Sequence, residues 1–172
     1  PTVHHSSGAF HYEDLLRPGV ECEIAVRLAS DLPQTGTAYD RESVAPAVEA
    51  VMAAIEIVDD RWTDYRSIDT PTLIADDFFG AGCVLGPPVT DWRSVDLSGV
   101  AGSMSINDEV VGKGVGRDIL GHPLEALAWL ANLVTARALR LKAGEFVLLG
   151  SIVETHWIEI GDVVTVEIEG LG

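Results

Sequence analysis

The alternation of apolar and polar residues along this chain predicts a protein built mainly from β-strands. Residues 19–28 read GVECEIAVRL and alternate with a period of two, so the predicted strand has two chemically different faces. One face carries Val20, Cys22, Ile24 and Val26, and the other carries Glu21, Glu23, Ala25 and Arg27. Residues 54–61 alternate again, with Ile55 and Ile57 on one side and Glu56 on the other, and predict a second strand.

Apolar residues at helical spacing predict two main helices. The first covers residues 43–54, where Ser43 is the expected N-cap and Pro46 lies in the first turn. This helix would run directly into the strand of residues 54–61. The second covers residues 122–139, with Pro123 at its start and leucines spaced to form one apolar stripe.

The remaining segments predict short strands and tight turns. We expect a strand at residues 82–86, a hairpin that turns at Asn107–Asp108, a strand within residues 142–151, and two more strands that meet at Gly161–Asp162. Residues 1–18 predict an irregular lead-in segment that contains one short strand. Residues 1–172 are therefore expected to form a single β-rich α+β domain.

Composition and charge restrict the class of protein. The 172 residues include 11 Lys and Arg against 27 Asp and Glu, which gives a formal charge of −16, and 47% of the residues are hydrophobic. A hydrophobic content of this size is typical of a globular protein. The negative surface repels nucleic acid and anionic membranes, so we expect neither as a partner. No apolar run reaches the roughly 18–20 residues that cross a bilayer.

The cysteines and the N-terminal residues indicate the cellular compartment of the protein. Cys22 and Cys83 stand in apolar surroundings and predict buried free thiols rather than a disulfide framework. The opening PTVHHSSGAF shows neither the basic nor the apolar segment of a signal peptide. We therefore expect a reducing, cytoplasmic compartment.

Glu21 and Glu23 form the first candidate site. Their spacing places both carboxylates on one face of a strand, where they repel each other, and burial would increase the repulsion. A hard divalent cation would convert this repulsion into binding, with Mg²⁺ or Mn²⁺ preferred and Ca²⁺ less specific. Glu56 is the candidate third ligand because it interrupts the apolar run AAIEIV. Taken alone, the residues leave an alternative open, in which the glutamates lie on the solvent face of an edge strand.

Five segments in a fixed order resemble one protein family. They are GVECEIAVRL, AAIEIVDDR, ILGHPLEALAWLANL, LKAGEFVLLGS and GDVVTVEIEGLG. From about residue 15 to the C-terminus the chain resembles the fumarylacetoacetate hydrolase superfamily, in particular its 2-keto-4-pentenoate hydratase / 2-oxo-3-hexenedioate decarboxylase branch. The resemblance implies a mixed β-roll of curved sheets, a divalent ion held by Glu21, Glu23 and Glu56, and assembly into a homo-oligomer.

The resemblance also implies a chemistry. A divalent ion would chelate a small 2-oxo acid and stabilise its enolate. The expected reaction is hydration of 2-hydroxypenta-2,4-dienoate in the degradation of aromatic compounds. Decarboxylation of 2-oxo-3-hexenedioate and hydrolysis of a carbon–carbon bond in an acylpyruvate are alternatives, because one metal site serves all three reactions. A further alternative is a non-catalytic partner subunit that retains the fold.

The chain departs from the family pattern upstream of its first glutamate. Hydratases of this branch usually carry an active-site lysine in a strand before that position. Our expectation is that this upstream region is absent from the chain, either because the protein is a clipped C-terminal domain or because the upstream part is missing. No residue of the chain is therefore assigned as the catalytic acid or base.

Two further residues are candidates for substrate binding. In ADDFFGAG, residues 75–82, Asp76 matches an Asp of the family, while Asp77 replaces an Asn and Phe78–Phe79 replace small residues. These phenylalanines would enlarge the apolar lining of the site or, alternatively, pack in the core. Ser151 matches the serine of a family segment LTGS. Its alternative role is a hydrogen bond to its own backbone.

Overall fold

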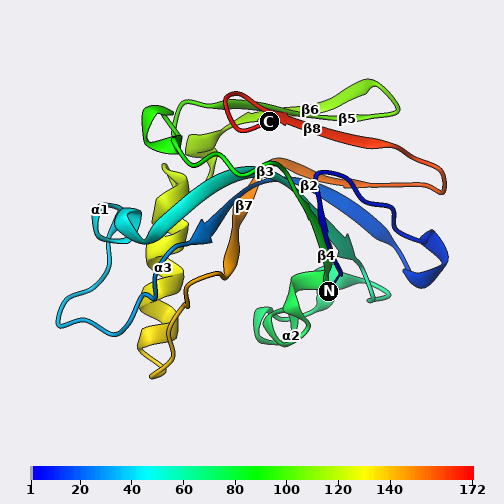
Figure 1. The fold of residues 1–172 in the computed structure, drawn as a ribbon. Coiled ribbons are helices and arrows are strands. Elements are labelled where there is room, and N and C mark those ends of the chain that lie inside the picture. Colours follow the sequence, from blue (N-terminus) through cyan, green and yellow to red (C-terminus); the bar gives the residue numbers. More distant parts are fainter. Residues whose placement is uncertain (1) are drawn as a thin grey trace.

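The computed structural model describes residues 2–172 as two β-sheets and three α-helices (Figure 1). The strands are β1 (Thr2–His5), β2 (Pro18–Leu28), β3 (Val48–Asp59), β4 (Gly80–Leu85), β5 (Ala101–Ile106), β6 (Glu109–Val115), β7 (Phe146–Trp157) and β8 (Val164–Ile168). The helices are α1 (Arg41–Val44), α2 (Thr70–Ala75) and α3 (Pro123–Thr135).

The larger sheet has the strand order β1-β4-β3-β2-β7, and the smaller one has the order β6-β5-β8. In the larger sheet β1 runs parallel to β4, and the other neighbours are antiparallel. Figure 1 shows the larger sheet strongly curved, with the smaller sheet across its convex side and α3 and α2 towards its two ends. The expected β-rich fold of curved sheets with few helices is confirmed.

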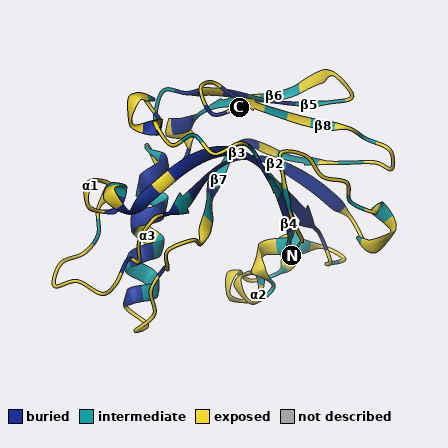
Figure 2. Cartoon of the chain, in the orientation of Figure 1, coloured by how far each residue is buried: buried dark blue, intermediate teal, exposed yellow. Residues whose placement is uncertain are grey.

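The main hydrophobic core lies between the two sheets. The apolar face of β2, which includes Val20, Ile24 and Val26, belongs to one buried cluster with Met104 of β5 and Ile168 of β8. The opposite face of β2 and β3 is buried as well, under a smaller cluster of mostly small side chains. As a result β2 and β3 are buried along almost their whole length (Figure 2). The two faces of β2 are those that the alternation predicts.

Two glycines let β6 lie directly against β7. A Cβ atom on Gly114 would lie 1.8 Å from the carbonyl oxygen of Ile152, and one on Gly112 would lie 2.1 Å from Cγ1 of Val153. Neither distance leaves room for a side chain. This contact joins the smaller sheet to the strand that closes one edge of the larger sheet.

The predicted helix over residues 43–54 is wrong beyond Val44. Helix α1 ends there, a 3-10 turn follows at residues 45–47, and β3 begins at Val48. The N-cap is Asp40, and Ser43 is the third helical residue of the capping box. The apolar spacing in this segment fits both a helix and a strand, and antiparallel pairing with β2 decides in favour of a strand, which contains several β-branched residues.

The second half of the chain follows the prediction more closely. The hairpin between β5 and β6 turns at Asn107 and Asp108, whose φ angles of 50° and 66° are those of a type I′ turn. Helix α3 lies within the predicted helix 122–139 and ends earlier, at Thr135. The two strands expected around Gly161–Asp162 are instead the end of β7, which runs unbroken to Trp157, and β8.

Both cysteines are buried free thiols, as predicted. Burial raises the pKa of Cys22 to about 12, and the nearby Glu23 charge adds to this effect. Within residues 2–172, no helix combines the length and the apolar character needed to cross a bilayer.

Candidate metal centre

Three glutamates converge on the face of the larger sheet opposite the main core. Glu21 and Glu23 lie two residues apart on β2, and Glu56 on β3 is the direct cross-strand partner of Glu21. One carboxylate oxygen from each residue lies within 4.8 Å of the others. Like charges placed directly opposite each other in a sheet are destabilising. The arrangement therefore calls for a positive charge between them.

The protein itself supplies little to offset these charges. Glu23 is only 2% exposed, and none of the ion pairs formed by the described residues involves Glu21, Glu23 or Glu56. Burial, together with the charges of Glu56 and Glu21, raises the pKa of Glu23 to about 8. Burial and the charges of Glu21 and Asp77 raise the pKa of Glu56 to about 7. A set of three carboxylate donors, one of them buried and none of them ion-paired within the described residues, fits a hard divalent metal ion.

Neighbouring groups on β7 fix the orientation of two of these carboxylates. The Gly150 N–H donates a hydrogen bond of 2.7 Å to Oε2 of Glu23, and the Thr155 hydroxyl donates one to Oε1 of Glu21. Gly150 has a φ of +131°, which is accessible to glycine, and the pairing of β2 with β7 is irregular on both sides of Glu23. Each carboxylate keeps a second oxygen that is free to bind a metal.

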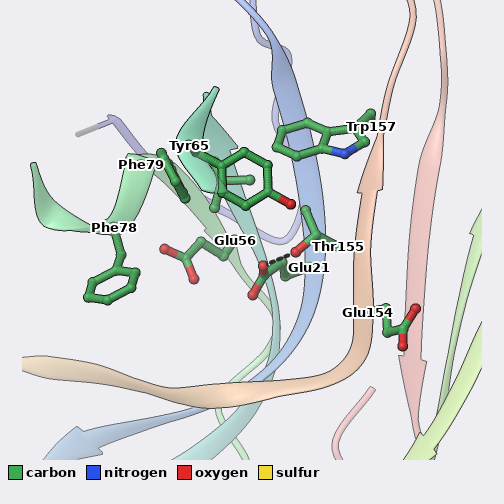
Figure 3. Close-up of a pocket in the computed structure, with 9 residues that line it drawn as sticks. Glu21, Glu56, Tyr65, Phe78, Phe79, Glu154, Thr155 and Trp157 are labelled. Atoms are coloured by element: carbon green, nitrogen blue, oxygen red, sulfur yellow. Dashed lines mark hydrogen bonds between the residues drawn. The ribbon is translucent and has the colours of Figure 1, made fainter. Parts of the chain in front are cut away.

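A cavity of about 520 Å³ opens beside the glutamates. Its lining residues are Glu21, Glu56, Val58, Tyr65, Phe78, Phe79, Glu154, Thr155 and Trp157. Figure 3 shows the aromatic rings arranged around the carboxylates of Glu21 and Glu56, with Thr155 hydrogen-bonded to Glu21. The aromatic rings place a largely apolar space directly next to the acidic cluster.

A family model settles the relationship of this chain to known proteins. The model of the fumarylacetoacetate (FAA) hydrolase C-terminal region matches residues 4–172. The chain belongs to the fumarylacetoacetate hydrolase family. The resemblance that the five sequence segments indicate is thereby confirmed.

Relatives within the family include hydratases and decarboxylases. The chain is 40% identical over 158 residues to a 2-hydroxyhexa-2,4-dienoate hydratase from Comamonas testosteroni, with 92% of this chain and 59% of the relative covered. It is 33% identical over 165 residues to a 4-oxalocrotonate decarboxylase from Pseudomonas putida, with 96% and 61% covered. The chain thus spans about three fifths of the length of these curated relatives.

A solved member of the family has the same fold. The 4-oxalocrotonate decarboxylase from Pseudomonas putida G7, complexed with magnesium and adipate, superimposes with a TM-score of 0.90 at 30% identity. The match covers 99% of this chain and 64% of that one. A second structure of the same enzyme is complexed with calcium and acetate. Divalent metals are therefore found in a close structural relative.

Asp76, a sequence candidate for substrate binding, has protein partners. Its carboxylate forms an ion pair of 3.2 Å with Arg61 and accepts a hydrogen bond of 3.2 Å from the indole N–H of Trp62. Arg61 also donates to the carbonyl oxygen of Asp76 at 2.9 Å and to that of Phe79 at 3.5 Å. Asp76 thereby anchors the turn that carries Asp77, Phe78 and Phe79. Direct contact between Asp76 and a substrate stays a prediction.

Ser151, the other candidate, lies opposite Glu23 in the register of β2 with β7. Its hydroxyl is 2.6 Å from the carbonyl oxygen of Val153 and 3.1 Å from that of Cys22. These contacts agree with the alternative that a serine in a strand hydrogen-bonds to nearby backbone. A role for Ser151 in substrate binding also stays a prediction.

The sequence pattern missed several residues around the metal centre. Tyr65 begins a short 3-10 helix between β3 and α2, and Thr155 and Trp157 lie at the end of a strand whose extent the periodicity does not reveal. The contribution of Gly150 is a backbone N–H, which leaves no side-chain signature. Among the aromatic residues of the cavity, the sequence singles out only Phe78 and Phe79, through their departure from the family pattern.

Proposed function

We propose that this chain holds a divalent metal ion, Mg²⁺ or Mn²⁺, on Glu21, Glu23 and Glu56, and acts on a small 2-oxo or 2-hydroxydienoate acid. The observation that carries the proposal is the convergence of three carboxylates, one of them buried, beside an apolar cavity. The magnesium complex of the related decarboxylase supports the choice of ion.

The residues of this chain would prepare the site for such a substrate. A divalent ion on these carboxylates would act as a Lewis acid towards the oxygens of a 2-oxo acid and favour its enolate. The Gly150 N–H and the Thr155 hydroxyl hold two of the ligands in place before any ion binds. The rings of Tyr65, Phe79 and Trp157 reduce the access of water, which strengthens electrostatic interactions at the centre.

Hydration of 2-hydroxypenta-2,4-dienoate is the reaction that we propose first. It is supported by the 40% identity with a hydratase of the next longer dienoate. Decarboxylation of 2-oxo-3-hexenedioate is the second candidate, supported by the TM-score of 0.90 with a decarboxylase. Self-association of the chain and a cytoplasmic location stay predictions.

A turnover assay tests the proposed function. The protein, loaded with Mn²⁺, is offered 2-hydroxypenta-2,4-dienoate, 2-oxo-3-hexenedioate and an acylpyruvate in separate reactions. We expect it to consume only the first, and to lose this activity when a chelator removes the metal. Consumption of only the second would replace hydration by decarboxylation. Mn²⁺ binding without turnover of any of the three would refute an enzymatic function and favour a non-catalytic partner subunit.

A further inference from the structure

The cavity beside the metal centre presents aromatic rings and carboxylates to its occupant. Among the described residues that line it, none is a lysine, an arginine or a histidine. Four lining side chains are aromatic, and the carboxylates of Glu21 and Glu56 lie among them, whereas the side chain of Glu154 lies on the other side of β7 (Figure 3). Aromatic faces carry a negative quadrupole and do not replace a cation as a partner for an anion.

Three arginines lie against residues of the cavity wall, and none of them is among its described lining residues. The guanidinium of Arg66 lies 5.4 Å from the ring centroid of Tyr65. The guanidinium of Arg17 lies 4.3 Å from the ring centroid of Trp157 and forms an ion pair of 3.1 Å with Asp60. Arg61 is paired with Asp76. Arg17 and Arg61 therefore support the wall of the cavity, and their charges are balanced by aspartates outside its lining.

The aromatic wall is held in one arrangement. The rings of Tyr65 and Phe79 meet edge to face, with centroids 5.6 Å apart and an interplanar angle of 77°. Asp77, Phe78 and Phe79 all have positive φ angles, of 59°, 44° and 70°, which is unfavourable for residues other than glycine. Strained backbone of this kind persists where the surrounding contacts fix it, and it is concentrated at functional sites.

The charge balance of the centre disfavours a second anion. Three carboxylates and one divalent ion leave a net negative charge before any substrate binds. The carboxylate of a 2-oxo acid would add another. Among the described lining residues, a second carboxylate at the far end of the substrate would then meet aromatic rings and no cation to pair with.

We propose that this aromatic cavity selects 2-oxo acids with an uncharged, apolar tail and rejects those with a second carboxylate. This inference rests on the proposed function, because it takes the metal centre as the binding site for the 2-oxo acid head. It assigns specificity to Tyr65, Phe78, Phe79 and Trp157, which would contact the tail of the substrate.

A pair of unreactive acids tests the proposal. 2-Oxohexanoate and 2-oxohexanedioate have the same chain length and the same head, and differ in a single distal carboxylate. Titration calorimetry with Mn²⁺-loaded protein should give a dissociation constant at least about tenfold lower for the monoacid, a difference of about 1.4 kcal/mol. Equal or tighter binding of the diacid would overturn the proposal.

A charge placed in the wall sharpens the test. Phe78 lines the cavity and is 49% exposed, so Phe78→Arg adds a cation where a distal carboxylate would lie and disturbs little of the core. This variant should reduce the preference for the monoacid at least about tenfold. Ile74→Arg is the matched control, because Ile74 lies on α2, is 63% exposed and is not part of the cavity lining.

The control separates a local effect from the overall charge. Ile74→Arg makes the same change to the net charge of the protein and should keep the wild-type preference. A shift as large as that of Phe78→Arg would refute selection by the cavity wall. Failure of both acids to show metal-dependent binding to the wild-type protein would refute the proposed function itself and this inference with it.

Discussion

Replacing Glu23 by glutamine would separate the charge of this residue from its shape. Glutamine has nearly the same size and keeps an oxygen that can accept the hydrogen bond from the Gly150 N–H. The change removes only the ionisable group, which is 2% exposed in the folded protein. We therefore expect the fold to survive and the affinity for a divalent ion to be lost.

The size of the effect on stability follows from the pKa of Glu23. Burial raises this pKa from 4.5 to about 8, so the folded protein binds the proton more tightly than the unfolded chain does. The free energy of unfolding of the metal-free protein should therefore fall as pH rises from 4.5 to 8, and the loss is complete above pH 8. Each tenfold change in proton affinity corresponds to 1.36 kcal/mol. Relative to low pH, the free energy of unfolding should therefore fall by about 5 kcal/mol in total, of which about 3 kcal/mol is lost by pH 7.

Urea unfolding at pH 5, 7 and 8.5 measures this effect. In the presence of a chelator, Glu23→Gln should be more stable than the wild-type protein at the two higher pH values and should show a weaker dependence on pH. Adding Mn²⁺ at about a hundred times its dissociation constant should stabilise the wild-type protein by about 2.7 kcal/mol and leave the variant unchanged. Glu49→Gln, on the exposed part of β3, is the matched control. It breaks a surface ion pair with Arg27, and such pairs contribute at most about 1 kcal/mol.

Two results would refute this reasoning. If the metal-free wild-type protein and Glu23→Gln lose stability in parallel between pH 5 and 8.5, the Glu23 carboxyl does not carry the raised pKa. If Mn²⁺ stabilises the variant as much as it stabilises the wild-type protein, Glu23 is not a ligand.

Three further changes test the surroundings of the centre and the fold. Asp76→Asn weakens the ion pair with Arg61 that anchors the aromatic turn, so KM for the dienoate should rise several-fold while Mn²⁺ affinity measured by calorimetry stays the same. In Gly19→Ala the new methyl group would lie 2.9 Å from the ring of Trp157, so the ring must move, and the quenching of tryptophan fluorescence by a bound 2-oxo acid should decrease. Asp108 has a φ of 66° at the second position of a type I′ turn, where glycine is preferred, so Asp108→Gly should raise the free energy of unfolding by up to about 1 kcal/mol, and an unchanged or lower urea midpoint would contradict this account of the turn.

The sequence predicts the convergence of the three glutamates better than it predicts the extent of the helices. A period of two is enough to place Glu21 and Glu23 on one face of a strand, and the structure has them there. The position of Glu56 opposite Glu21 depends on the register of two strands, which the alternation alone does not fix. The sequence marks Glu56 only through its place in an apolar run and through the family resemblance. The predicted helix fails over residues 48–54 because their small apolar side chains satisfy a helix and a buried strand equally well, and only the pairing with β2 distinguishes the two.

The arrangement of the residues that line the cavity cannot be predicted from sequence patterns. Tyr65, in a connection, and Trp157, at the end of β7, are brought together by the curvature of the larger sheet, which depends on long-range pairing. Asp76 shows a different limit of sequence analysis. It matches a family residue, but the match does not reveal that its carboxylate forms an ion pair with Arg61.

The glycine contacts between β6 and β7 limit how this chain can evolve. Gly112 and Gly114 are only partly buried, so their surface exposure alone would mark them as positions that tolerate substitution. They are as intolerant as core positions, because any side chain would push Ile152 and Val153 away, within a few residues of the Gly150 amide and Thr155. Variation along this edge of the protein should therefore accumulate at the intervening residues, and a saturation library of β6 would show alternating permissive and forbidden positions.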